Sequence, residues 1–283
     1  MKKYVVLYSG GRSSSECALT MAKKYGAENV ILLNHDINPH VEQDCTKKLK
    51  ADVADYLGLE VTYANHKDWS VATPISVCVD ASAWKISQGG KIGDVLCTSR
   101  LKTEPFTRWL KENDPDHENV YVYGFDLDEP TRITRRSQIM GQMGYKTIFP
   151  MTWDRKDRVT LEDVNIEAGS VYEMFKHSNC TGCLKAGWQH WYIVFCTRPD
   201  IWAEAKLAED EIGYAIHKDK FGAVYLEDKE EMFTKMKEAG LEPNEHIAFQ
   251  TFWAKARKAV RDYDAEMKAL EEHDDGVCLE CMG

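Results

Sequence analysis

The stretch YSGGRSSS at residues 8–15 decides how the N-terminal half of this chain folds. Residues 4–8 read YVVLY, which is typical of a short buried strand, and residues 16–24 are good helix formers that end before Gly26. A strand, a Gly-Gly turn, a serine cluster and a helix together predict a phosphate-binding loop. The glycines permit positive φ and close approach of backbone N–H groups, and the helix N-terminus adds the positive end of its dipole.

The loop fits neither of two common phosphate-binding patterns. Walker A requires Gly-Lys-Ser/Thr, and the Rossmann fingerprint requires G-x-G-x-x-G. An ordinary Gly-Ser turn is the alternative interpretation, since short glycine motifs recur by chance. If the loop binds phosphate, the residues that contact the nucleotide are Ser9, Gly10, Gly11, Arg12, Ser13, Ser14 and Ser15.

The composition is that of a soluble globular protein. The chain has 283 residues, of which 43% are hydrophobic and 29% charged, enough for one large core or one core with a smaller appendage. The N-terminal apolar run is too short for a signal peptide, and no stretch approaches the roughly 18 apolar residues of a membrane span. We therefore expect a cytoplasmic protein with no membrane partner. The net charge of −10 argues against broad, non-specific nucleic-acid binding.

Strands and helices alternate through the first half of the chain. This alternation predicts an α/β fold with a doubly wound, mostly parallel sheet that binds its ligand at the carboxyl ends of the strands. The polar segments 9–15, 34–38 and 125–132 each follow an expected strand and should converge on one pocket. Further strands are expected at residues 29–33, 59–63, 120–124 and 146–149, and helices at 42–57, 99–112 and 135–143.

The pattern changes after Trp153, so we expect two domains. Residues 1–155 form the nucleotide-binding α/β domain, and residues 156–283 form a helical region with a cysteine-containing segment and an acidic tail. In the second region we expect helices at residues 160–169, 201–212, 229–239 and 247–272.

Cysteine usage points to metal or redox chemistry. Nine cysteines in a reducing compartment do not suggest a disulfide framework. Cys180 and Cys183 form a C-x-x-C knuckle that places two thiolates on one metal, with Gly182 allowing the tight turn. Cys97 is the first choice for a third ligand, and His177, His190 and Cys196 are the other candidates. A structural zinc site and a pair of buried thiols remain the alternatives.

Four blocks of the chain resemble the phosphoadenosine phosphosulfate (PAPS) reductase-like family, in its bacterial and phage branch. This family belongs to the PP-loop, adenine nucleotide α-hydrolase-like superfamily, whose loop reads Ser-Gly-Gly-x-Asp/Ser-Ser. The resemblance spans residues 1 to about 210 and implies adenine nucleotide binding and sulfur chemistry. In order, the blocks are SGGRSSS at 9–15, CTSRLKTEPFTRWL at 97–110, YGFDLDEPTR at 123–132 and NCTGCLKAGWQHW at 179–191, with a weaker match, IFPMTW, at 148–153.

The resemblance also implies a [4Fe–4S] cluster, because iron–sulfur members of the family hold one with a loop cysteine and a C-x-x-C pair. Carried over by motif, the ligands are Cys97, Cys180 and Cys183. The adjacent double cysteine of adenylylsulfate reductases is absent, since Leu96 and Thr98 flank Cys97. The fourth position is then an open iron, as in PP-loop thiolases, or is filled by Cys196.

A set of basic residues follows two of these blocks. Arg100, Lys102 and Arg132 could bind phosphate or sulfate, and Arg135 and Arg136 come next along the chain. We assign Arg100 to nucleotide binding and Lys102 and Arg132 to catalysis; the alternative is a solvated face balanced by nearby acids. Asp36 and Asn38 lie where adenine or ribose would be read, unless they only form an Asx-turn at Pro39.

The C-terminal tail contains Cys278 and Cys281. Thioredoxin-dependent PAPS reductases attack sulfur with a cysteine near the C-terminus, so Cys281 is a candidate nucleophile. The tail reads CLECMG and lacks that family's Glu-Cys-Gly-Leu-His motif, and an incidental metal-binding end is the alternative.

Together these features predict an enzyme that binds an adenine nucleotide (ATP, PAPS or adenylylsulfate) and reduces a sulfonucleotide to sulfite, with an iron–sulfur cluster and a thiol reductant protein. The enzymatic alternative is an ATP-dependent sulfurtransferase that adenylates and thiolates a nucleic acid. The non-enzymatic alternative is a regulatory protein that binds nucleotide and metal. In each case we expect a homo-oligomer.

Overall fold

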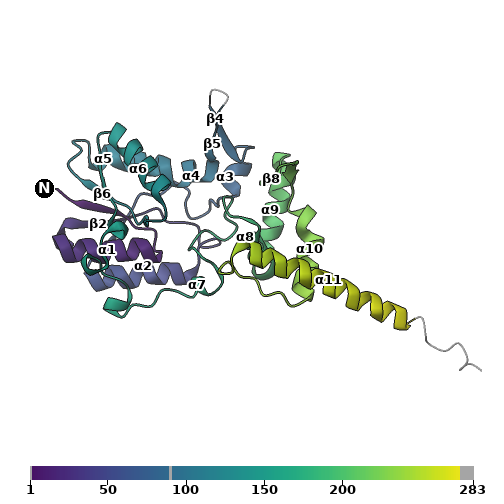
Figure 1. The fold of residues 1–283 in the computed structure, drawn as a ribbon. Coiled ribbons are helices and arrows are strands. Elements are labelled where there is room, and N and C mark those ends of the chain that lie inside the picture. Colours follow the sequence, from purple (N-terminus) through teal and green to yellow (C-terminus); the bar gives the residue numbers. More distant parts are fainter. Residues whose placement is uncertain (1, 89–90, 275–283) are drawn as a thin grey trace, which may run out of the picture. The chain divides into compact units, whose positions relative to one another are not determined.

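The computed structural model describes residues 2–88 and 91–274, and the chain divides into two compact units (Figure 1). The first comprises Met1–Glu173 and His177–Cys183, and the second comprises Met174–Lys176 and Leu184–Gly283. The expected boundary at residue 155 falls inside the first unit. Residues beyond it pack into that unit: Leu161 is fully buried beside helix α1 (Arg12–Tyr25), and the Val159 N–H donates to Thr20 Oγ1 at 2.9 Å.

A five-stranded, all-parallel sheet organises the first unit, so the fold is α/β as expected. The strand order β3-β2-β1-β6-β7 places β1 in the centre, and the chain crosses to one side of it and then to the other. The strands are β1 (Tyr4–Leu7), β2 (Val30–Asn34), β3 (Val61–Tyr63), β6 (Val120–Val122) and β7 (Lys146–Ile148). This reversal between β1 and β6 is the switch point at which such sheets open a crevice at their carboxyl ends.

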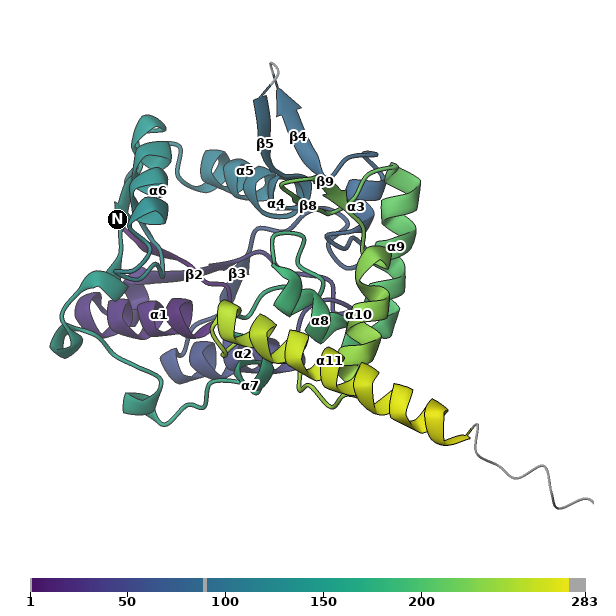
Figure 2. The same cartoon turned by 45° about the vertical axis from the view of Figure 1, so that its right-hand side comes forward.

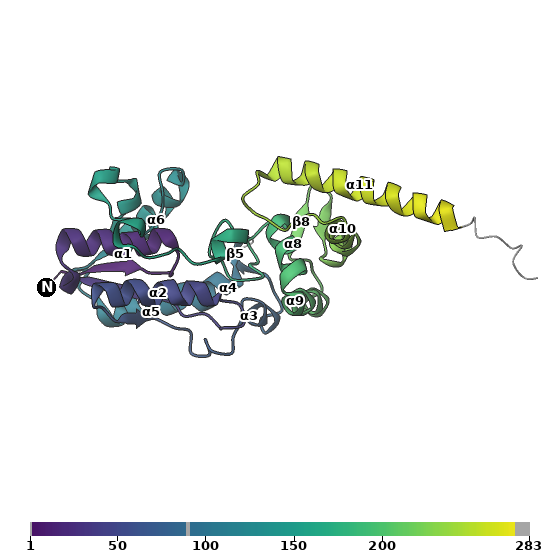
Figure 3. The same ribbon diagram turned by 90° about the horizontal axis from the view of Figure 1, so that it is seen from below.

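Helices cover both faces of the sheet. Alternate side chains of each strand point to opposite faces, so Val6 packs with α1 and α2 (Asp44–Leu57), which lie side by side in Figure 3. Val5 instead packs with α5 (Glu104–Asn113) and α6 (Pro130–Gln142) on the other face. Burial on both faces explains why the inner strands β1, β2 and β6 are almost entirely apolar, whereas the edge strands β3 and β7 include polar residues.

A small hairpin interrupts the expected α/β alternation between β3 and α5. Helix α3 (Ser76–Val79) leads into the antiparallel strands β4 (Lys85–Gln88) and β5 (Lys91–Val95), which stand side by side in Figure 2. The chain returns through α4 (Leu96–Thr98) and a π-helical turn, η2 (Ser99–Thr103), into α5. The expected helix at 99–112 is therefore a composite whose first turn is widened.

Two other expected helices differ from the structure. Helix α6 begins at Pro130 rather than at residue 135, because proline at the first helical position needs no N–H partner. The expected helix at 160–169 is only a 3₁₀ turn, η5 (Glu162–Val164), which ends where Asn165 adopts positive φ. The remaining short elements of the first unit are η1 (Ala27–Asn29), η3 (Pro150–Thr152) and η4 (Arg155–Asp157), with α7 (Val171–Met174) at its end.

The second unit is helical around an aromatic core. Its helices are α8 (Trp188–Thr197), α9 (Pro199–Ile212), α10 (Glu227–Glu238) and α11 (Phe249–Asp274), with a hairpin of β8 (His217–Asp219) and β9 (Gly222–Val224). Tyr192 and Phe233 contact with ring centroids 5.2 Å apart. Buried Glu209 accepts backbone N–H bonds from Ile216 and Leu226, both at 2.8 Å, which ties both ends of the hairpin to α9. Among the described residues, no helix combines the length and apolar character needed to cross a membrane.

We predict that Leu161→Ala destabilises the chain although it lies beyond residue 155. Removing a fully buried leucine leaves a cavity and costs about 2–5 kcal/mol of unfolding free energy. Leu127→Ala is the matched control, because Leu127 is 72% exposed and its loss should change stability by less than about 0.5 kcal/mol. Urea denaturation measures both. Equal midpoints for the two variants would show that residues 156–173 do not belong to the first core.

Candidate functional site

The two glycines of the loop at residues 9–15 lie at positions where a side chain would be crowded by its neighbours. Gly10 has φ +77°, and a Cβ there would meet Thr46 O at 3.1 Å and Lys50 Cβ at 3.2 Å, both on α2. Gly11 is the N-cap of α1, and a Cβ on it would lie 2.5 Å from Ser178 Oγ. Gly10 is therefore favoured by its positive φ as well as by tight packing, whereas Gly11, with φ −83°, is constrained only by the side chains around it.

Serine hydroxyls stabilise the turn from within. Ser14 Oγ donates to the Gly11 carbonyl at 2.9 Å and lies 3.1 Å from Ser9 Oγ, while the Gly11 N–H donates to Ser9 Oγ at 3.4 Å. The amides of the first helical turn have no partners within the helix. The Arg12 N–H donates to the Tyr172 hydroxyl at 2.9 Å, and the Arg12 guanidinium pairs with Glu162 at 2.7 Å. The Arg12 side chain is thus already engaged by an acid.

The ends of β1, β2 and β6 meet around this loop, but the predicted convergence on one pocket is only partial, because residues 125–132 do not line the cavity described below. A Cβ on Gly124, which follows β6, would lie 3.0 Å from the backbone of Ser13 and Ser14. Asn34, at the end of β2, donates from Nδ2 to the Tyr8 carbonyl at 2.5 Å. The segments that follow β1, β2 and β6 are therefore in direct contact at one edge of the sheet.

A cavity of about 110 Å³ opens at this edge, which we call the strand-end cavity. Its size suits one ring system rather than a whole nucleotide, since sites for larger ligands span about 300–1,000 Å³. Its lining residues are Leu7, Tyr8, Ser9, Leu33, Asn34, His35, Ile37, Glu42 and Lys102.

Of the three cations expected around one anion, only Lys102 lines the strand-end cavity. Arg100 pairs with Glu104 at 3.0 Å and lines a separate cavity with His66 and Arg108. Arg132 lies in the first turn of α6, is 62% exposed, pairs with Glu129 and stacks over the Phe125 ring at 4.3 Å. These two cations therefore face other partners in this structure.

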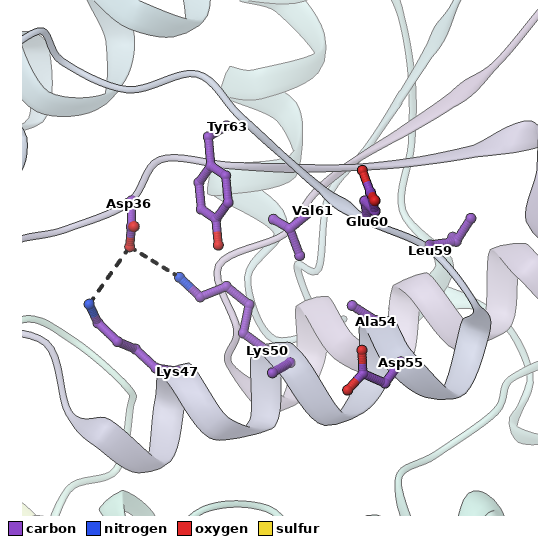
Figure 4. Close-up of a pocket in the computed structure, with 10 residues that line it drawn as sticks. Asp36, Lys47, Lys50, Ala54, Asp55, Leu59, Glu60, Val61 and Tyr63 are labelled. Carbon is purple, nitrogen blue, oxygen red and sulfur yellow. Dashed lines mark ion pairs between the residues drawn. The ribbon is translucent and has the colours of Figure 1, made fainter.

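Asp36 points away from the strand-end cavity. Its Oδ1 lies 3.5 Å from Lys50 Nζ and 3.9 Å from Lys47 Nζ, in a neighbouring cavity of about 330 Å³ between α2 and β3 (Figure 4). Asn38 accepts the His40 N–H at 2.9 Å, so the Asx-turn at Pro39 is present.

Lys50 was missed by sequence reasoning, although it is the most buried cation of the site. Its side chain is 4% exposed, and Nζ lies 3.1 Å from Asn34 Oδ1 and 3.4 Å from Glu42 Oε1. The sequence did contain a signal for its burial: Lys50 lies on the buried face of α2, four residues after Thr46 and three before Val53. Its charge ties α2 to the end of β2.

The segment that carries the cysteine knuckle lies against the loop and against the residues that precede α2. Ser178, just before the knuckle, lies 2.5 Å from the position of a Cβ on Gly11. The Thr181 N–H donates to the Val41 carbonyl at 2.8 Å, and Gln43 Nε2 donates to Thr181 Oγ1 at 2.7 Å, on either side of Glu42, which lines the strand-end cavity. Gly182, between the two cysteines, has φ +73°. Burial raises the pKa of Cys180, whereas the charge of Lys102 lowers it. The knuckle and the loop at residues 9–15 therefore share one region of the first unit.

The predicted four-cysteine centre is not assembled in this structure. Cys180 and Cys183 are neighbours, whereas Cys97 lies beside Cys78, and Cys196 belongs to the second unit with Tyr192 as its hydrogen-bond partner. Within residues 2–88 and 91–274, no three or more His, Cys, Asp or Glu side chains are grouped to hold a metal. Cysteine thiolates are suitable ligands for zinc or iron, but in this structure only the Cys180 and Cys183 pair is positioned to bind one metal. Cys278 and Cys281 lie outside the described residues.

The two histidines considered as ligands belong to different units. His177 is exposed next to the knuckle, whereas His190 is buried in the second unit with Nδ1 3.4 Å from Glu245 Oε1.

No protein-family model matches this chain, and no curated protein matches it either. The likeness to the PAPS reductase-like family therefore rests on the four sequence blocks. Two of these blocks, at 9–15 and 123–132, contribute residues that meet around the loop, and Ser178, just before the block at 179–191, lies beside Gly11.

We predict that His35 makes the stability of the chain depend on pH. Burial lowers the pKa of His35 to about 4, with a smaller contribution from the charge of Lys102, although the hydrogen bond from Nδ1 to the Ala64 carbonyl at 2.6 Å acts to raise it. The pKa of an unfolded histidine is about 6.5, so the unfolded state binds the proton first as the pH falls. The stabilising contribution is complete above pH about 6.5 and is lost towards pH about 4.

Replacing this histidine by His35→Gln keeps a side-chain donor and removes the titration. Urea midpoints measured across this window should fall less steeply for His35→Gln than for the wild type. His40→Gln, at an exposed position of the same unit, is the control. An unchanged slope in His35→Gln would contradict the assignment.

Proposed function

We propose that this chain is a PP-loop enzyme of the PAPS reductase-like class, which binds an adenine nucleotide and carries out sulfur chemistry beside it. The observation that supports this proposal is the packing of the cysteine knuckle against the Gly-Gly-Ser loop. Ser178 lies against Gly11, Thr181 bonds to Val41, and the charge of Lys102 acts on Cys180. A nucleotide phosphate on the loop would then lie near the knuckle thiols.

Each part of the site has a role in this proposal. The backbone amides of Ser13 and Ser14 hold phosphate, because those of Gly11, Arg12 and Ser15 already donate within the unit, and the serine hydroxyls of the loop (Ser9, Ser13, Ser14 and Ser15) add donors. Lys102 neutralises charge on the nucleotide at the strand-end cavity, where it is the cation that lines the space. A metal centre would draw its ligands from Cys97, Cys180 and Cys183 and would supply thiolate-bound iron or zinc chemistry.

The proposed reaction is reduction of a sulfonucleotide. A thiolate, with Cys281 as candidate, attacks the sulfur, the sulfur–oxygen bond breaks, and the nucleotide leaves through its phosphate oxygen. A second thiol from a reductant protein then attacks the cysteine sulfur, which releases sulfite and leaves a disulfide. Two thiols are oxidised and one sulfur is reduced by two electrons, so the step balances.

One observation favours ATP-dependent thiolation of a nucleic acid as the second candidate. A sulfonucleotide carries several anionic groups, yet Lys102 alone of the three expected cations lines the strand-end cavity. Adenylation would need only the loop to hold the departing pyrophosphate. Exposed Arg132 and Arg135 on α6 would then be available to contact an acceptor backbone.

We predict that Gly10→Val abolishes adenine nucleotide binding while the chain remains folded. A β-branched residue disfavours φ +77° and would clash with α2, so the loop would lose its geometry. Gly58→Val is the matched control, because Gly58 also has positive φ, at +64°, but a Cβ there would meet nothing within 4 Å. Calorimetric titration with ATP and adenylylsulfate measures binding, and circular dichroism checks folding. Wild-type affinity in folded Gly10→Val would refute the loop assignment.

The reaction itself is tested by product analysis. Chain reconstituted anaerobically with iron and sulfide is incubated with PAPS or adenylylsulfate and a dithiol, and sulfite is measured. In parallel, ATP with a mixed RNA or DNA pool is assayed for AMP and pyrophosphate. Sulfite formation that is lost in Lys102→Ala is the expected result. AMP and pyrophosphate without sulfite would select thiolation, and binding without either product would select the regulatory alternative.

A further inference from the structure

A hairpin places a second cysteine beside Cys97. Leu96 N–H donates to the Trp84 carbonyl at 2.9 Å, continuing the antiparallel register in which Lys85 faces Val95. The chain that leaves α3 therefore returns against it, and α3 contacts α4. As a result, the backbone of Cys97 hydrogen-bonds to the thiol of Cys78, nineteen residues earlier in the chain.

Cys78 is held in a fixed, buried position. It is fully buried, and its carbonyl accepts the Ala83 N–H at 3.0 Å in the turn that follows α3. Burial raises the pKa of Cys78 to about 12, and the neighbouring Cys97 raises it as well. A backbone N–H directed at a cysteine sulfur is also an interaction that stabilises and tunes a metal-bound thiolate.

The first unit thus contains two cysteine pairs, Cys78 with Cys97 and Cys180 with Cys183, and Lys102 links them. Lys102 lies in the π-helical turn that begins two residues after Cys97, and it lines the strand-end cavity together with Glu42. Thr181, next to Cys180, bonds to Val41 and Gln43 on either side of Glu42. A π-helical turn inside a helix is costly and occurs frequently at functional sites. The other two described cysteines of this unit are engaged elsewhere: Cys17 is buried in the core, and Cys45 Sγ accepts the Val171 N–H at 3.3 Å.

We propose that Cys78 is the fourth thiol ligand of the metal centre, together with Cys97, Cys180 and Cys183, in place of Cys196. This inference rests on the metal centre of the proposed function. Four thiolates are the set that a tetrahedral zinc ion or a [4Fe–4S] cluster takes. Because the structure groups no three of them within its described residues, the metal must draw the two pairs together, and each thiol releases its proton to solvent.

Metal content tests this assignment without relying on activity. Full-length chain is reconstituted anaerobically, once with iron and sulfide and once with zinc, and bound metal, sulfide and thiolate-to-iron absorbance are measured. Cys78→Ser and Cys97→Ser should each lose most of the bound metal. Cys196→Ser and Cys45→Ser are the matched controls and should retain it. Retention of wild-type metal in Cys78→Ser, together with loss in Cys97→Ser, would overturn the assignment and leave the centre to another fourth ligand.

A second measurement avoids dependence on the folding of the Cys78 variant. X-ray absorption of zinc-loaded chain carrying Cys278→Ser and Cys281→Ser counts sulfur ligands after the tail thiols are removed. Four sulfurs at about 2.3 Å are expected, and three sulfurs with one lighter atom would overturn the proposal. Absence of bound metal in the wild type would overturn it as well. ATP affinity, measured on the same samples, tests the nucleotide part of the proposed function separately.

Discussion

The close packing of three glycines around the first turn of α1 is the constraint on which the rest of the site depends. A Cβ on Gly10 would lie 3.1 Å from α2, one on Gly11 2.5 Å from the Ser178 hydroxyl, and one on Gly124 3.0 Å from the backbone of Ser13 and Ser14, so all three positions are tightly packed. The helix N-terminus is therefore surrounded by backbone from three distant parts of the chain. Such backbone offers N–H donors in a fixed arrangement, which is the property that an anion site requires.

A buried charge network supports this arrangement from the side of α2. Lys50 lies between Asn34, Glu42 and Asp36, and Asn34 in turn bonds to the Tyr8 carbonyl at the entrance to the loop. Removing one partner of a buried pair typically costs about 3–5 kcal/mol because the remaining charge is left uncompensated. The network therefore fixes the relative positions of β1, β2 and α2, and with them one wall of the strand-end cavity.

The positions of cations and cysteines depend on the helix that follows Cys97 and on the hairpin that precedes it. Arg100 and Lys102 are two residues apart and so face different sides: Arg100 pairs with Glu104 four residues later, while Lys102 lines the strand-end cavity. Cys97 precedes the same turn, and the β4–β5 hairpin has brought it next to Cys78. The contact between Cys97 and Cys78 comes from the hairpin, so the spacing of residues 97–110 did not predict it.

Local sequence by itself determined the α/β class, the parallel strands, the glycine loop and the tight turn at Gly182, because these depend on the hydrophobic period and φ preferences of neighbouring residues. Only the tertiary structure decided that residues 156–173 join the first core, that Asp36 pairs with lysines, that Lys50 is buried and that Cys78 faces Cys97. These relations connect residues from 11 to 139 positions apart, and are set by which surfaces bury most apolar area and satisfy most backbone groups. No pattern within a single element carries that information.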